Sequence, residues 1–103
     1  MTFQQYVVYP RKEGATFNEE YYKTKHMPRV EELWAPHGLK SWKVVKFHDD
    51  NPYTYAGVVE WESVDAFQKA MQQDSVKEIM GDLVNFSNEQ PQVLMGDVLT
   101  ASS

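Results

Sequence analysis

The sequence predicts a small α+β protein, in which a four-stranded antiparallel sheet carries two helices on one face in the order βαββαβ. Three observations predict this fold class. Apolar and polar residues alternate in short segments, which is typical of strands. Apolar residues recur every three or four positions in two longer segments, which is typical of amphipathic helices. Capping and turn-forming residues separate these segments, and 103 residues suit a single domain over 1–103 with a frayed tail at 100–103.

The first half of the chain is expected to contain a strand followed by a long helix. Residues 3–9 alternate and predict the strand. Thr16 and Glu19 form the pattern T-x-x-E, a capping box that satisfies free backbone N–H groups at the start of a helix. The helix is expected to continue to about Ala35. Pro28 lacks an N–H group and is expected to kink or divide it.

The second half is expected to contain a hairpin, a divided helix and a last strand. The segments 40–48 and 53–61 predict two antiparallel strands, because the turn-forming residues DDNP lie between them. Ser63 is positioned to cap the second helix, and the pattern S-x-x-E that begins at Ser75 predicts a break and a restart. Residues 92–99 follow a proline and predict the fourth strand.

Composition excludes several classes of protein. The chain has no cysteine, which excludes disulfides and thiolate chemistry. It has no run of 18 apolar residues and no signal-peptide pattern, so a cytoplasmic protein without a membrane span is expected. The three histidines lack zinc-type spacing, and no glycine-rich phosphate loop or dinucleotide fingerprint occurs. We therefore expect neither a metal nor a cofactor.

Nucleic-acid binding is not expected, although the RNA-recognition motif shares the order βαββαβ. In the third strand, Ala56 and Val58 occupy the two positions where that motif has stacking aromatic residues, and Thr54 replaces its leading basic residue. The formal net charge of −5 also disfavours binding to a polyanion.

Apolar residues on both faces of the sheet predict a homodimer. In the third strand, Tyr55 and Trp61 fall on one side, and Ala56 and Val58 fall on the other. Two helices cover only one face of such a sheet, and soluble monomers rarely leave a large apolar patch exposed. A second copy that packs sheet to sheet would cover it. The alternative is a monomer with an adhesive face.

His26 and Asp82 are the candidate catalytic residues. His26 lies within the apolar face of the first predicted helix, two residues before Pro28. It is either a hydrogen-bonded core histidine or a group that exchanges protons near neutral pH. Asp82 lies at the edge of the apolar face of the second helix. It either forms a surface ion pair, or it orients His26 or accepts a proton itself.

Four further residues are candidates for substrate binding. Tyr22 lies one helical turn before His26, and its hydroxyl could donate to a carbonyl or enolate oxygen, or it could be ordinary core. Asn85 shares the side of the helix that carries Asp82, and it could donate to a substrate oxygen or cap the helix end. The aromatic residues Trp61 and Phe86 are candidate walls of a pocket, an interface or the core.

Four segments resemble the EthD family, named for ethyl tert-butyl ether degradation, of the dimeric α/β-barrel superfamily. They are YVVYPRKEG at the end of the first strand, the segment from Tyr22 to Pro28 with its H-x-P, the Gly38-Leu39 pair after the helix, and DLVNFS followed by Pro91. The resemblance spans nearly the whole chain. It implies a ferredoxin-like subunit, a homodimer with facing sheets, and a cavity between sheet and helices. The positions that match the family's site are His26 and Asp82, with Tyr22 and Asn85 as weaker matches.

The resemblance implies an enzyme or a binding protein for small molecules. Relatives of this architecture include cofactor-independent monooxygenases, polyketide cyclases, dehydratases, decarboxylases and lactone isomerases, and the EthD group is associated with oxidative catabolism and with secondary metabolism. Our first hypothesis is acid/base chemistry on an apolar, aromatic or polyketide-like molecule. His26 would act as general acid or base, Asp82 would orient it, and Tyr22 or Asn85 would stabilise an oxyanion.

Three alternatives stay open. The first is a cofactor-free oxidoreductase, the second is haem binding through a histidine, and the third is a non-catalytic accessory protein that binds a pathway intermediate or assists a partner enzyme.

Overall fold

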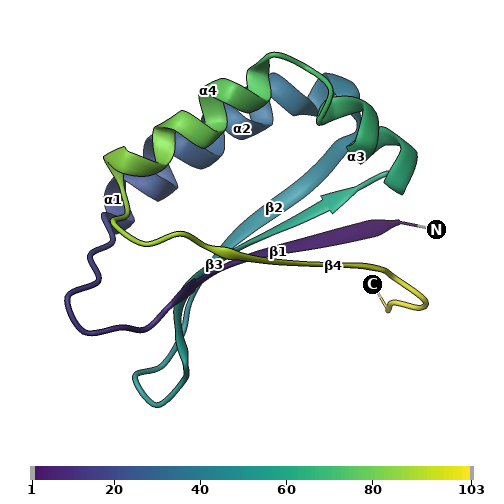
Figure 1. Ribbon diagram of the computed structural model, residues 1–103. Coiled ribbons are helices and arrows are strands. Elements are labelled where there is room, and N and C mark those ends of the chain that lie inside the picture. Colours follow the sequence, from purple (N-terminus) through teal and green to yellow (C-terminus); the bar gives the residue numbers. More distant parts are fainter. Residues whose placement is uncertain (1, 103) are drawn as a thin grey trace.

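The computed structural model describes residues 2–102 and confirms the predicted fold class (Figure 1). The elements, in chain order, are β1 (Phe3–Pro10), α1 (Glu19–Tyr21), the π-helical turn η1 (Tyr22–His26), α2 (Met27–Trp34), the 3-10 turn η2 (Ala35–His37), β2 (Leu39–Lys46), β3 (Tyr53–Trp61), α3 (Val64–Ala70), α4 (Ser75–Gly81), the 3-10 turn η3 (Asp82–Asn85) and β4 (Gln92–Asp97). The strands form one sheet in the order β2-β3-β1-β4, and every neighbouring pair is antiparallel.

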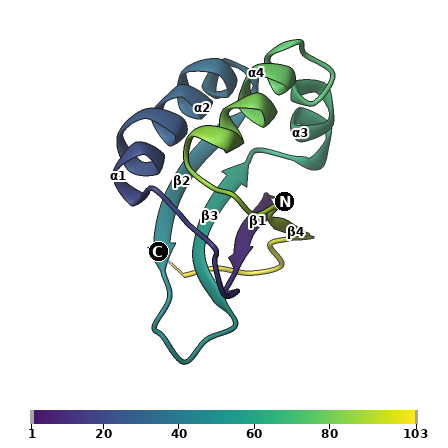
Figure 2. The ribbon, with the colours of Figure 1, turned by 60° about the vertical axis from the view of Figure 1, so that its left-hand side comes forward.

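The helices all lie over one face of this sheet, and the two views show α4 running beside α2 (Figures 1 and 2). The core fills the space between the two layers. Its buried members are Phe3, Tyr9, Tyr22, Met27, Val30, Trp34, Leu39, Val59, Trp61, Ala70 and Phe86. An ion pair on the outside of the helical layer joins α2 to α4, because Arg29 Nη2 donates to Glu78 Oε1 at 3.0 Å.

The register of β1 decides which residues meet the helices. Successive side chains of a strand point to opposite faces, and Phe3 and Tyr9 belong to the core beneath the helices. Gln5 and Val7 therefore share that face. Gln5 pairs with Val59 in β3 and with Met95 in β4, which places it near the middle of the sheet.

The first helix begins later than the sequence predicts. Its N-cap is Asn18, whose side chain accepts a hydrogen bond from the backbone N–H of Tyr21 at 3.1 Å. The capping box predicted at Thr16 is wrong, because the Thr16 N–H donates to Asn88 Oδ1 at 2.7 Å instead. A β-bridge between Phe17 and Ser87 draws this stretch into an extended conformation before the helix starts.

The expected irregularity at Pro28 takes the form of a π-helical turn. The five residues Tyr22–His26 are π-helical, and the N–H of Met27 bonds to the carbonyl of Tyr22, five residues earlier. Pro28 follows as the second residue of α2, where its missing N–H group removes one backbone hydrogen bond from the helix. π-Helical turns occur often at functional sites, and this one ends at His26.

The second helix is divided as predicted, with one correction. Ser63 caps α3 by accepting a hydrogen bond from the N–H of Ala66 at 3.1 Å. The capping box predicted at Ser75 is wrong, because α4 is preceded by Asp74 without a side-chain cap, and Ser75 Oγ accepts a hydrogen bond from Trp34. The helix nevertheless breaks between Ala70 and Ser75.

The strand boundaries agree with the prediction to within a few residues. The strand expected at 40–48 runs over Leu39–Lys46, and the last strand ends at Asp97 rather than at residue 99.

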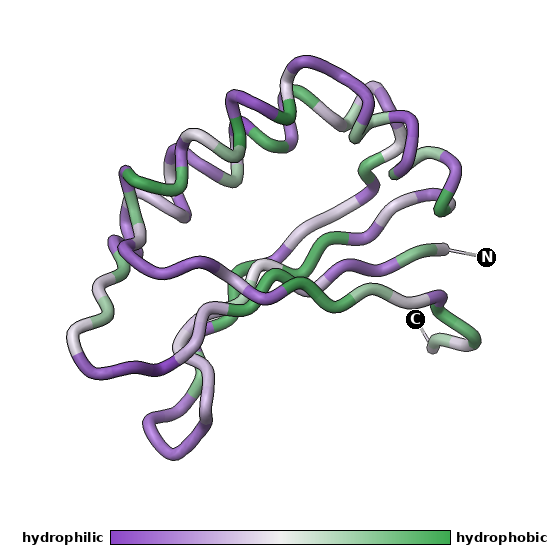
Figure 3. Tube along the Cα trace, viewed as in Figure 1, coloured by the Kyte–Doolittle hydropathy of each residue, from purple (hydrophilic) through white to green (hydrophobic). Residues whose placement is uncertain are grey.

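The face of the sheet opposite the helices carries no further layer formed by residues 2–102 (Figure 1). Tyr6 in β1 and Leu94 in β4, which lie opposite each other on this face, are exposed. Figure 3 shows hydrophobic stretches in the strands as well as in the helices, whereas the β2–β3 hairpin turn is largely hydrophilic. No helix in the described range is long and apolar enough to cross a membrane.

Candidate functional site

A cavity of about 380 Å³ lies between β1 and the helices α2 and α4. Its walls are mainly apolar. The residues that line it are Gln5, Val7, Tyr9, His26, Met27, Val30, Trp34, Val59, Met71, Val76, Ile79, Met80, Leu83, Phe86, Gln90, Pro91 and Val93. The volume and the apolar walls suit a small molecule with few polar groups.

His26 enters this cavity from the helical layer. Its residue surface is 6% exposed, and its ring stacks on Tyr22 with ring centroids 5.3 Å apart. Phe86 packs against the same ring at 4.5 Å. Tyr22 and Phe86 also contact each other, with ring centroids 4.9 Å apart, so the three rings form one cluster that fixes the orientation of the imidazole.

Asp82 forms a hydrogen bond with one nitrogen of that imidazole. The distance from His26 Nδ1 to Asp82 Oδ2 is 2.8 Å. The other carboxylate oxygen accepts hydrogen bonds from the Tyr21 hydroxyl at 2.6 Å and from Asn85 Nδ2 at 2.8 Å. Partial burial acts to raise the pKa of Asp82, but the hydrogen bonds from Tyr21, Asn85 and His26 outweigh it and lower the pKa. Asp82 is therefore ionised at neutral pH.

An ionised Asp82 accepts a hydrogen bond from the N–H group at Nδ1, which leaves the lone pair of a neutral His26 on Nε2. Burial lowers the pKa of His26 below its ordinary 6.5, while the nearby Asp82 opposes this shift. Within residues 2–102, Nε2 has no hydrogen-bond partner. Every fully buried side-chain nitrogen or oxygen in this range does have a partner. Nε2 therefore reaches open space, and His26 lines the cavity.

The structure thus brings together the two residues predicted to carry the chemistry, and it separates the four predicted to bind substrate. Phe86 lines the cavity. Tyr22 does not, because it is 2% exposed and its hydroxyl lies against Gly57 of β3. Asn85 donates a hydrogen bond to Asp82 and is not among the residues that line this cavity. Trp61 is fully buried beneath the cavity wall.

Two residues of the site are absent from the sequence prediction. Tyr21 donates a hydrogen bond to Asp82, whereas the sequence had suggested only its neighbour Tyr22, as a donor to the substrate or as core. A π-helical spacing, which relates residues five apart, would have pointed to Tyr21, because His26 lies five positions after it. Gln5 lines the cavity from the sheet, and its position on the alternating inner face of the first strand was the available signal.

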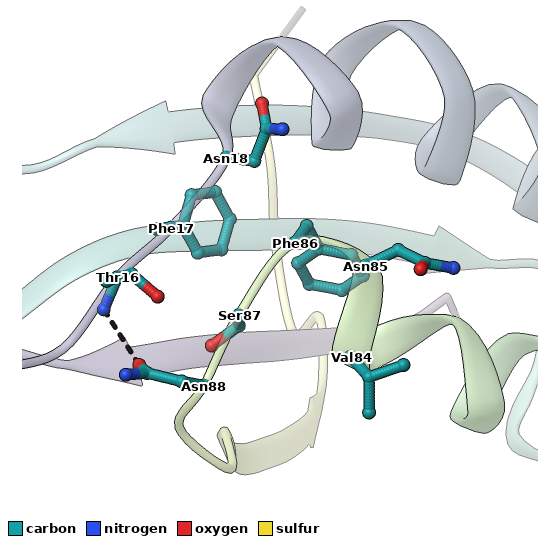
Figure 4. A pocket seen from close by; sticks show the side chains of 8 residues that line it. All are labelled: Thr16, Phe17, Asn18, Val84, Asn85, Phe86, Ser87 and Asn88. Carbon is teal, nitrogen blue, oxygen red and sulfur yellow. Dashed lines mark hydrogen bonds between the residues drawn. The ribbon is translucent and has the colours of Figure 1, made fainter.

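A second hollow of about 290 Å³ lies where the loop before α1 meets the segment after η3 (Figure 4). Its walls include Thr16, Val84, Asn85 and Asn88. The Thr16 N–H donates a hydrogen bond to Asn88 Oδ1 in this wall, and no side chain that lines the hollow titrates near neutral pH. Among residues 2–102, no cluster of three or more His, Asp or Glu side chains could hold a metal ion.

Solved structures of known proteins resemble this chain over nearly its whole length. An EthD-like protein from Ralstonia eutropha JMP134 is 26% identical, with a TM-score of 0.86, over 99% of this chain and 96% of that chain. An EthD family protein from Bacillus halodurans C-125 is 18% identical, with a TM-score of 0.74, over 96% of this chain and 100% of that chain.

A third structure shares the fold at lower similarity. SnoaB, a cofactor-independent oxygenase from Streptomyces nogalater, is 14% identical, with a TM-score of 0.62, over 97% of this chain and 92% of that chain. No protein-family model and no curated protein sequence matches the chain.

The two EthD proteins share the observed architecture over at least 96% of this chain. The chain therefore resembles EthD-like proteins over nearly its whole length and shares their α+β fold.

Proposed function

We propose that this protein is an enzyme that moves a proton on a small, largely apolar molecule bound in the cavity, without a bound cofactor. The observation that carries this proposal is the geometry of His26. Its Nδ1 is held by an ionised Asp82, its Nε2 has no hydrogen-bond partner among residues 2–102, and His26 lines an apolar cavity. A pair of this kind is a general base at neutral pH.

The expected reaction begins with transfer of a C–H proton of the ligand to Nε2. The resulting imidazolium is stabilised by Asp82, which accepts a hydrogen bond from Nδ1 and carries the opposite charge. Return of the proton to another atom of the ligand gives isomerisation, and loss of a leaving group from the carbanion gives elimination. Attack of the carbanion on a carbonyl carbon of the same molecule, followed by protonation of the resulting alkoxide, gives cyclisation. A positioned general base typically accelerates such a step by about 10²–10⁴-fold.

Exchange of protons for deuterium tests this step without knowledge of the natural substrate. We suggest 2-tetralone as probe, because it is small and aromatic and has acidic C–H bonds beside its carbonyl group. The protein in D₂O is expected to accelerate loss of the C1 proton signal, measured by NMR. His26→Ala should reduce the accelerated rate by about 10²-fold or more.

The matched control is His37→Ala, which removes an exposed histidine from the turn η2. It should leave the exchange rate unchanged. Equal exchange rates for the wild type and His26→Ala would contradict the proposal.

An oxidative reaction is a second candidate, and the similarity to a cofactor-independent oxygenase favours it. Here the carbanion formed by the same proton transfer would react with dioxygen as second substrate. The test reaction is oxidation of anthrone by dioxygen to anthraquinone and water. Oxygen uptake that depends on His26 would support this candidate, whereas proton exchange without oxygen uptake would favour isomerase or lyase chemistry.

We also propose that two copies associate through the face of the sheet opposite the helices. Support comes from the exposed apolar residues Tyr6 and Leu94 on this face.

If the protein is instead a binding protein without catalysis, the ligand should bind in the cavity and show no exchange above the buffer rate.

A further inference from the structure

We propose that Gln5 is the residue that recognises the ligand, by donating a hydrogen bond from its amide nitrogen to a carbonyl or enolate oxygen. The ligand class is then a small apolar molecule with a carbonyl group next to an acidic C–H bond. This inference rests on the proposed function of the cavity. It assigns to Gln5 the oxyanion contact for which the sequence had suggested Tyr22 or Asn85.

The orientation of the Gln5 amide follows from its partner. Trp61 Nε1 lies 3.3 Å from Gln5 Oε1. An indole N–H is only a donor, so the amide must turn its oxygen toward Trp61. Trp61 is fully buried and packs against Trp34 and Phe67, which makes it a rigid anchor. The amide nitrogen of Gln5, with its two N–H groups, must therefore point elsewhere.

This amide nitrogen is available to a ligand. It has no hydrogen-bond partner within residues 2–102. In that range, every fully buried side-chain nitrogen or oxygen has a partner. Because the Gln5 nitrogen has none, it is not fully buried and reaches open space. Gln5 lines the same cavity as His26, from the sheet side, whereas His26 lines it from the helical side.

The other polar residues of the cavity wall are less suited to this role. Tyr9 is 4% exposed and packs edge to face against Tyr22. Gln90 is exposed, in the coil before β4, and no hydrogen bond from residues 2–102 fixes its amide. Gln5 is the polar group that combines a fixed orientation with free donors.

The chemistry of proton removal requires such a donor. When a base takes a proton from the carbon next to a carbonyl group, negative charge develops on the carbonyl oxygen. A preorganised N–H donor stabilises this charge most effectively in a cavity with apolar walls. The arrangement of His26 and Gln5 on opposite walls allows one molecule to present its C–H bond to one residue and its oxygen to the other.

Binding of two matched probes tests this assignment. The probes are 2-tetralone and its methylidene analogue, in which a CH₂ group replaces the carbonyl oxygen. Affinity is measured by tryptophan fluorescence at pH 8. Loss of one hydrogen bond should weaken binding of 2-tetralone by about three- to tenfold and leave binding of the analogue within twofold.

Two substitutions remove the donor in different ways. Gln5→Met removes both amide groups, and Gln5→Glu keeps an oxygen acceptor for Trp61 while it replaces the N–H donors. Both should lose the preference for the ketone. The control is Gln4→Met on the opposite face of β1, which should change neither affinity. Thermal unfolding confirms that each variant is folded.

The outcomes separate this inference from the proposed function. Equal weakening of both probes, unchanged ketone affinity, or failure of the wild type to bind 2-tetralone would overturn the role of Gln5. His26→Ala should bind 2-tetralone like the wild type. The wild type could prefer the ketone in a way that depends on Gln5 and yet show no proton exchange. That result would support the role of Gln5 and contradict the catalytic role of His26.

Discussion

His26 shows at the scale of single residues how burial and a charged neighbour act against each other. Burial lowers the pKa of the imidazole, and Asp82 acts to raise it. The net shift is downward, so the ring is a neutral base at pH 7. The Nδ1 contact to Asp82 then serves mainly to select the tautomer that leaves Nε2 free.

The titration of His26 should therefore be sensitive to Asp82. The NMR titration of its ring protons is expected to have a midpoint below 6.5, and Asp82→Asn should lower this midpoint further because it removes the opposing charge. The ring-proton signals that disappear in the spectrum of His26→Ala are those of His26. A midpoint that rises in Asp82→Asn would contradict the geometry described above.

The same shift makes stability depend on pH. The unfolded chain binds a proton at His26 near pH 6.5, and the folded protein binds it only at lower pH. The free energy of unfolding should therefore decrease as pH falls from about 6.5 through the folded-state pKa. The pKa of Asp82 is lowered from its ordinary 3.8 in the folded protein. Asp82 therefore stabilises the protein above pH 3.8, and this stability is lost as pH falls through the folded-state pKa.

Gly57 is a second residue whose identity follows from one contact. A Cβ atom at this position would lie 2.3 Å from the Tyr22 hydroxyl oxygen and 3.4 Å from the ring carbon that carries it. Gly57→Ala should destabilise the protein by about 1–3 kcal/mol, because the core must move to accommodate the methyl group. Chemical denaturation measures this change.

Two further variants identify the cause of that destabilisation. Tyr22→Phe removes the hydroxyl, so the double variant with Gly57→Ala should recover part of the lost stability. Gly96→Ala in β4 is the control, because no atom lies within 4 Å of its added Cβ. Additive losses in the double variant would rule out the contact as the cause.

At the scale of elements, the segment from α1 to α2 forms one helical rod that carries Tyr21, Tyr22 and His26. The π-helical turn changes the spacing along this rod, so that Tyr21 and His26 both reach Asp82 while Tyr22 packs toward the sheet. Asn18 fixes where the rod begins, because its side chain caps the first turn.

Asn18→Ala should destabilise the protein by about 1 kcal/mol, because the Tyr21 N–H loses its acceptor. The free energy of unfolding from chemical denaturation measures this effect. Thr16→Ala is the control, since Thr16 contributes its backbone N–H to the contact with Asn88 and an alanine keeps that group. A larger loss in Thr16→Ala than in Asn18→Ala would restore the capping box as the start of the helix.

At the scale of the whole molecule, the sheet divides two environments. One face holds the core, the cavity and the site, and the other exposes Tyr6 and Leu94. Apolar patches of this kind are uncommon on soluble monomers. The proposed association through this face would leave the helical layer of each copy in contact with solvent.

Light scattering after size-exclusion chromatography should give a mass of twice the 12.0 kDa of one chain at micromolar concentration. Leu94→Glu places a charge on the proposed interface and should shift the mass toward that of one chain. Val84→Glu is the matched control, because Val84 is 82% exposed on η3, on the helical side, and its substitution should leave the mass unchanged. A wild-type mass of 12.0 kDa would refute the dimer.

The local pattern of residues was sufficient to predict the order of the elements and the antiparallel sheet, and it gave the meeting of His26 with Asp82 as one of the alternatives for these residues. Alternation and helical periodicity are properties of neighbouring residues, and the faces that they define must pack together, so the histidine and the carboxylate on facing helices converge. The cap at Asn18 was missed because Thr16 also fits a capping pattern, and the contact of Thr16 with Asn88 spans 72 positions in the chain.

The remaining parts of the site depend on contacts between distant segments and on the exact winding of one helix. Tyr21 rather than Tyr22 binds Asp82 because one π-helical turn alters the angle between successive side chains, which a period of 3.6 residues does not describe. Gln5 presents its amide nitrogen because Trp61, 56 positions later, occupies its oxygen. Such orientations are set by which groups pack together in three dimensions, and only the folded structure brings those groups into contact.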